Sequence, residues 1–100
     1  MIADYERAIE TESVADLKRA YPSMTGLQQT GWEQFFQLVR DVQAQLSLTR
    51  LAVTGGAAEG HVVGTYTYLN SSTGRTETRP VAFNASFKQE AGRWRIGQIR

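Results

Sequence analysis

Two tyrosines, Tyr66 and Tyr68, carry the side chains of this sequence best suited to act on a small molecule. Residues two apart in a β-strand project from the same face of the sheet, so both hydroxyls could reach one pocket and donate a hydrogen bond to a ligand or an oxyanion. Tyrosine is also a common core or interface residue whose hydroxyl reaches the rim. We favour this second interpretation.

General acid–base chemistry would need His61, Asp41 or Asp4. His61 is the only histidine, and it stands beside Gly60 at the expected start of a strand, which favours the rim of a pocket over its centre. A catalytic imidazole normally has a partner that orients it, and none is evident in the sequence. The two aspartates are more simply explained as helix-end or surface residues, because acids are rarely buried unpaired. No catalytic set is therefore assembled.

Metal and cofactor chemistry have even less support in the sequence. One histidine and no cysteine leave scattered carboxylates without ligand spacing. No glycine-rich segment follows a strand and opens a helix, and no serine lies in a nucleophile-elbow motif. We therefore predict no catalytic residue, no metal site and no cofactor.

The length and composition predict a single globular domain over residues 1–100. No apolar run approaches the roughly 20 residues that cross a bilayer, and the N-terminus lacks the basic and apolar regions of a signal peptide. We expect a soluble segment without direct membrane contact. The absence of cysteine leaves a cytoplasmic or an extracytoplasmic location open.

The net charge of +1 conceals an asymmetry between the two parts of the chain. Residues 1–41 hold seven acids and four bases, for a charge of −3, whereas residues 42–100 hold three acids and seven bases, for a charge of +4. We interpret this as acidic helices against a more basic sheet. Nucleic acid is not expected as a partner, because binding would need denser clustering than that of Arg50, Arg75, Arg79, Arg93 and Arg95.

Helical patterns occupy about the first forty residues. Apolar side chains at helical spacing run from the N-terminus to Ile9. Ser13 caps a second short helix that Pro22 ends, and Thr25 opens a third with Gln28 completing a capping box. The apolar face of the third helix predicts deep packing for Leu27, Trp32, Phe35, Phe36 and Val39.

From Asp41 the apolar period changes to two, which predicts long strands joined by short turns in an antiparallel meander. A slip of phase predicts a β-bulge near Thr49 and Arg50. Pro80 cannot donate to a ladder, so its end of the strand should lie on an edge or at a bulge. The first loop is marked by Gly55, Gly56 and Gly60.

The order of three helices and then a bulged sheet, with the segments Tyr5–Glu10, Gly64–Tyr68 and Gly92–Ile96, resembles the nuclear-transport-factor-two-like superfamily, also called SnoaL-like. The resemblance covers nearly the whole chain. It implies an α+β fold of three N-terminal helices packed on a curved four-stranded antiparallel sheet, a cystatin-like cone with a pocket between sheet and helices. It also implies a shortened first helix, as in a domain excised from a larger bacterial protein such as a receptor-type kinase.

The resemblance leaves two functions open, because this fold hosts both enzymes and non-catalytic proteins. The first is a non-catalytic sensor or dimerisation module that binds an apolar small molecule or a protein partner, as a homodimer through the outer face of the sheet. The alternative is a small isomerase, dehydratase or cyclase acting on a hydrophobic carbonyl compound, with Tyr66 or Tyr68 as donor and Asp41 or His61 as base. The candidate pocket residues are Tyr5, Trp32, Phe36, Tyr66, Tyr68, Phe83 and Trp94.

Overall fold

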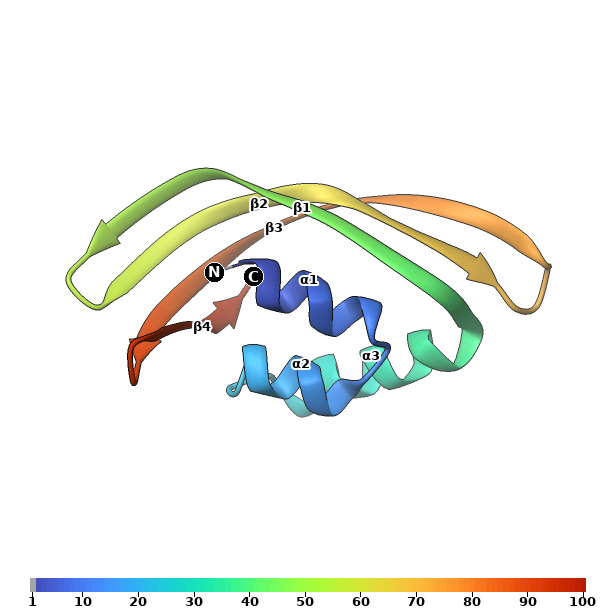
Figure 1. Ribbon diagram of the computed structural model, residues 1–100, viewed down its shortest axis with the longest axis horizontal. Coiled ribbons are helices and arrows are strands. Elements are labelled where there is room, and N and C mark those ends of the chain that lie inside the picture. The colour runs from blue at the N-terminus through green and yellow to red at the C-terminus, as the bar shows by residue number, and fades with distance from the viewer. Residues whose placement is uncertain (1) are drawn as a thin grey trace.

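Three helices precede four strands in the computed structural model, which describes residues 2–100. Every strand pair is antiparallel, the sheet order is β1-β2-β3-β4, and the sheet arches over the helices, which fill its concave side (Figure 1). The predicted α+β fold is confirmed. The elements are α1 (Ile2–Glu10), α2 (Val14–Ala20), α3 (Gly26–Leu38), β1 (Val39–Thr54), β2 (Ala57–Asn70), β3 (Arg75–Glu90) and β4 (Arg93–Ile99).

Helices α2 and α3 begin at the capping residues predicted for them. The Ser13 side chain accepts a hydrogen bond from the backbone N–H of Asp16, and Thr25 and Gln28 form a reciprocal capping box. These bonds satisfy N–H groups that have no partner inside a helix. Within residues 2–100, no helix has both the length and the apolar character to cross a membrane.

Two irregularities bend the β1–β2 pair. The pairing shifts between Leu48 and Arg50, which confirms the predicted bulge. A second shift lies between Arg40 and Gln43, where Asp41 has φ 54°. The first strand begins at Val39, two residues before the predicted start at Asp41. The prediction that Gly60 lies in the first loop was wrong. Gly60 is inside β2, where it pairs with Leu51 of β1.

The free edge of the sheet on the β3 side contains Pro80. β4 pairs with Ala85–Glu90, and next to it Asn84 exchanges two backbone hydrogen bonds with Arg100. The backbone N–H and C=O groups of alternate residues in an antiparallel strand point to the same neighbouring strand. Pro80 lies four residues before Asn84, so its backbone nitrogen points to the β4 side of β3, at a position where β4 has already ended. Its missing N–H therefore costs no ladder bond, as the predicted edge position requires.

The opposite edge, β1, is covered by two glutamates of α1. The Glu6 carboxylate accepts the backbone N–H of Leu46 at 2.7 Å, and the Glu10 carboxylate accepts that of Ala44 at 3.2 Å. Glu6 and Glu10 are four residues apart, which places both on one face of the helix. Helix α1 thus satisfies donors that an edge strand would otherwise expose to another chain.

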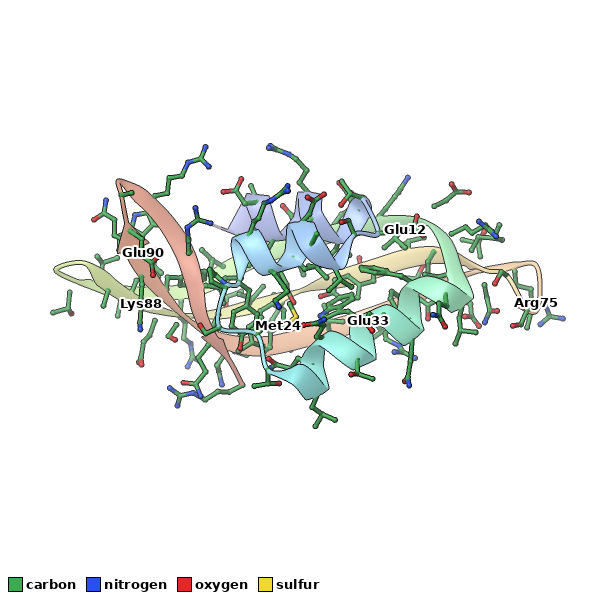
Figure 2. All side chains as sticks on the ribbon, turned by 90° about the horizontal axis from the view of Figure 1, so that it is seen from below. Glu12, Met24, Glu33, Arg75, Lys88 and Glu90 are labelled. Carbon is green, nitrogen blue, oxygen red and sulfur yellow. The ribbon has the colours of Figure 1, made fainter. Side chains whose placement is uncertain are left out.

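The core lies between the sheet and α1 and α2, where the fully buried side chains are Ile9, Leu17, Val62, Phe87 and Ile96. Figure 2 shows α1 and α2 side by side, whereas α3 runs from near Met24 toward the hairpin that carries Arg75. No residue of α3 is buried, so the predicted deep packing was wrong for Leu27 and too strong for Trp32, Phe35 and Phe36, which lie half-buried against the core. Val39 is buried, but it is the first residue of β1 and not part of the helix. Leu27 is 86% exposed because it precedes Trp32 by five residues, which is about 140° around the helix.

Candidate functional site

A cavity of about 430 Å³ opens between the helices and β3. A smaller hollow of about 290 Å³ shares Gln28, Trp32, Tyr66 and Val81 with it, so the two form one opening beside α3. The cavity lies between α3 and the part of β3, around Pro80–Phe83, that has no β4 partner. Its lining residues are Tyr5, Tyr21, Gln28, Trp32, Tyr66, Pro80, Val81, Ala82, Phe83 and Ile99.

Four of the predicted pocket residues form an aromatic wall of this cavity. Tyr5 meets Trp32 edge-on, with ring centroids 6.4 Å apart, and meets Phe83 at 6.2 Å. Trp32 in turn lies 5.9 Å from Tyr66. The two contacts of Tyr5 are edge-to-face and the contact of Trp32 with Tyr66 is tilted. Aromatic contacts of this kind fix ring positions, so the wall is preorganised by its own packing.

The other three predicted pocket residues lie elsewhere in the structure. Phe36 packs against Trp32 with centroids 5.4 Å apart, and Tyr68 packs edge-on against Phe35 at 5.1 Å, but neither lines the cavity. Trp94 lines a separate groove of about 330 Å³ between α1, α2 and β4. The shared strand face of Tyr66 and Tyr68 therefore does not bring both into one pocket.

Three tyrosines, Tyr5, Tyr21 and Tyr66, line the cavity. Burial raises the pKa of Tyr66 to about 12. Burial also raises the pKa of Tyr5 well above its ordinary value; the nearby Tyr66 raises it further, the Trp32 side chain lowers it, and Tyr21 adds a smaller increase. The Tyr21 hydroxyl accepts the backbone N–H of Ile99 at 3.1 Å, which leaves its own proton free to donate. The wall can therefore offer neutral hydrogen-bond donors to a ligand oxygen.

Tyr21 and Gln28 were missed as site residues from sequence. Tyr21 is the C-cap residue of α2, directly before Pro22, and Gln28 was assigned only to the capping box. A tyrosine at a helix C-terminus was the available signal, because a buried tyrosine hydroxyl usually needs a partner. That partner, Ile99, is 78 residues away along the chain.

The candidate bases lie outside the cavity, whose lining contains no carboxylate and no imidazole. His61 is the fifth residue of β2, not its start, and its Nδ1 lies 2.8 Å from Oδ1 of Asn84. Asp41 and Asp4 are exposed, and Asp4 lies 4.0 Å from Arg7. Across residues 2–100, no group of three or more potential metal ligands occurs.

Solved structures with the same architecture identify the fold. A conserved protein of Planctomyces limnophilus matches with a TM-score of 0.77 at 13% identity, over 97% of this chain and 85% of its own. A nuclear transport factor 2 (NTF2-like) superfamily protein of Salmonella enterica matches with a TM-score of 0.73 at 18% identity, over 99% and 82%. The chain has the NTF2-like fold. No protein-family model and no curated protein matches the sequence.

The NTF2-like fold does not by itself determine the chemistry of the cavity. Among the similar structures is the hexachlorocyclohexane dehydrochlorinase LinA-type3 of Novosphingobium barchaimii, with a TM-score of 0.68 at 10% identity, over 97% of this chain and 77% of that one. Identities this low establish shared architecture only. The function of this chain depends on its own side chains.

Proposed function

We propose that this chain is a non-catalytic module that binds a small, mostly apolar molecule carrying one hydrogen-bonding oxygen. The observation that carries the proposal is the aromatic cavity with tyrosine hydroxyls and without an acid or base. Its volume of about 430 Å³ lies within the range of roughly 300–1,000 Å³ that ligand sites occupy. Trp32 and Phe83 would hold the apolar body, and Tyr5, Tyr21 and Tyr66 would donate to the oxygen.

An isomerase, dehydratase or cyclase would need a general base within hydrogen-bond reach of the bound substrate. His61 is held by Asn84 and Asp41 is exposed, and neither contributes to the cavity lining. The tyrosines could act as donors but cannot serve as bases near neutral pH, because burial favours their neutral form. These features favour binding over catalysis.

The positions of the two tryptophans allow a direct test with 1-tetralone, a bicyclic aromatic ketone, as the probe. In a Trp94→Phe variant, Trp32 is the sole tryptophan and lines the cavity. Its fluorescence should change saturably as the probe is added. The Trp32→Phe variant keeps only Trp94, in the other groove, and should respond to the probe no more than free tryptophan does.

A tyrosine pair supplies the matched control for the hydrogen bond. In the Trp94→Phe background, Tyr66→Phe should weaken binding about two- to tenfold, the value of one neutral hydrogen bond. Tyr68→Phe removes the same atom from the same strand face outside the cavity and should leave affinity unchanged. Equal effects of both substitutions, or no saturable response of Trp32, would refute the proposal.

The proposal extends to a homodimer formed through the outer face of the sheet. The β2 side chains of Val63, Thr65 and Thr67 point away from the buried row at Val62 and Tyr66. Such β-branched positions suit packing against a second sheet. Sedimentation at micromolar concentration should give twice the 11.2 kDa chain mass, and Thr65→Lys should shift the species to a monomer. A wild-type protein that sediments only at 11.2 kDa would remove the dimer from the proposal.

A further inference from the structure

Four polar side chains form one row across the sheet, away from the apolar cavity. Arg50 of β1 pairs with His61 of β2, His61 pairs with Asn84 of β3, and Asn84 exchanges backbone hydrogen bonds with Arg100, directly after β4. Residues paired in this way project from the same face. The row lies on the outer face, because the next residue of β2, Val62, is fully buried on the inner one.

The row borders a hollow of about 750 Å³. The adjacent outer row contributes Ala52, Glu59 and Ser86, which are paired across the same three strands. Gly60 lies between the two rows in β2. The side chains of the hollow therefore include two guanidinium groups, one imidazole, an amide, a hydroxyl and a single carboxylate.

The charges of this hollow are not balanced within the described part of the chain. Neither Arg50 nor Arg100 forms an ion pair there, and Glu59 carries the only acidic side chain of the lining. His61 Nδ1 lies 2.8 Å from Oδ1 of Asn84, an acceptor only, so Nδ1 is the donor of this bond and Nε2 is left free to contact a ligand. Protonation of Nε2 would add a third positive charge and a further donor to the row.

We infer that this row binds a tetrahedral oxyanion of the phosphate-monoester class, and binds it more tightly when His61 is protonated. Arginine guanidinium groups match phosphate oxygens with paired N–H donors, and Ser86 adds a hydroxyl. The polar and charged groups around His61 on this face are Arg50 from β1, Glu59 from β2, Asn84 and Ser86 from β3, and, beyond Asn84, Arg100.

Sulfate is the probe that isolates the protein's contribution, because it stays a dianion from pH 5.5 to 8. Titration by calorimetry at constant, low ionic strength should show at least about fivefold tighter binding at pH 5.5 than at pH 8, as expected for one added charge at contact distance. His61→Gln should abolish this pH dependence while keeping the binding measured at pH 8. Arg50→Gln should weaken binding about tenfold at both pH values.

Arg75→Gln is the matched control, since it removes the same charge from the exposed β2–β3 hairpin and should leave sulfate affinity unchanged. Circular dichroism of each variant checks that it is folded. Equal weakening by Arg75→Gln and Arg50→Gln would reduce the effect to general charge and overturn the inference. Persistence of the pH dependence in His61→Gln, or absence of binding at millimolar sulfate, would overturn it as well.

Two further ligands distinguish the class of anion. Methyl phosphate should bind at pH 8 as sulfate does, whereas acetate should bind at least several-fold more weakly, and tighter binding of acetate would contradict the phosphate assignment. The inference is independent of the apolar cavity, so Arg50→Gln in the Trp94→Phe background should bind 1-tetralone normally. The proposal for the apolar cavity and the inference for the anion row can then fail independently of each other.

Discussion

Replacing Gly64 with alanine should destabilise the fold by about 3 kcal/mol, at the upper end of the cost of overpacking a core. Gly64 faces Leu46 across the β1–β2 pair, where a Cβ atom would collide with the carbonyl oxygen of Gln45 and lie 2.9 Å from Cα of Leu46. These are backbone atoms, so relief of the collision requires a displacement of β1. Against a total stability on the order of 5–15 kcal/mol, the loss is large.

Gly31→Ala supplies the opposite expectation in the same protein. A Cβ at Gly31 meets no atom within 4 Å, and alanine is favoured over glycine inside a helix by about 1 kcal/mol. Thermal unfolding followed by circular dichroism should show Tm rising by about 4–8 °C for Gly31→Ala and falling by at least about 12 °C for Gly64→Ala. Glycine normally weakens a strand, so a Gly64→Ala variant as stable as the parent would refute the close approach of the two strands.

Other consequences concern single side chains. Burial disfavours the phenolate of Tyr66 and raises its pKa from 10.0 to about 12. This contribution to the free energy of unfolding, roughly 2–3 kcal/mol, is fully present below pH 10 and is lost as the pH rises toward 12. Urea unfolding across that range should show a smaller alkaline loss in Tyr66→Phe, and an unchanged loss would contradict the shift. Glu6→Ala should cost about 1–2 kcal/mol in urea unfolding, because the N–H of Leu46 loses a charged acceptor, and a neutral result would refute the edge-capping role. Leu27→Gln should change the free energy of unfolding by less than about 0.5 kcal/mol, since Leu27 is 86% exposed.

Features set by local chemistry were predictable from the sequence. Ser13 and Thr25 begin helices because their hydroxyls bond backbone groups within three residues, and such bonds need no knowledge of the rest of the fold. Gly60 was misassigned because glycine marks both turns and close approaches. A Cβ there would lie 2.8 Å from the carbonyl oxygen of Arg50, so it marks a strand that passes close to its neighbour at the bulge.

The site was less predictable because it depends on contacts between distant segments. Strand periodicity places Tyr66 and Tyr68 on one face, and both are buried there. Which of them borders empty space is decided by α3, where Phe35 packs on Tyr68 while Trp32 stands beside the cavity at Tyr66. The periodicity of a strand indicates which face of the sheet a side chain lies on, but not whether a helix packs against that side chain or leaves a cavity beside it. The Tyr66→Phe and Tyr68→Phe pair therefore tests the one step of the functional argument that only the three-dimensional packing supplies.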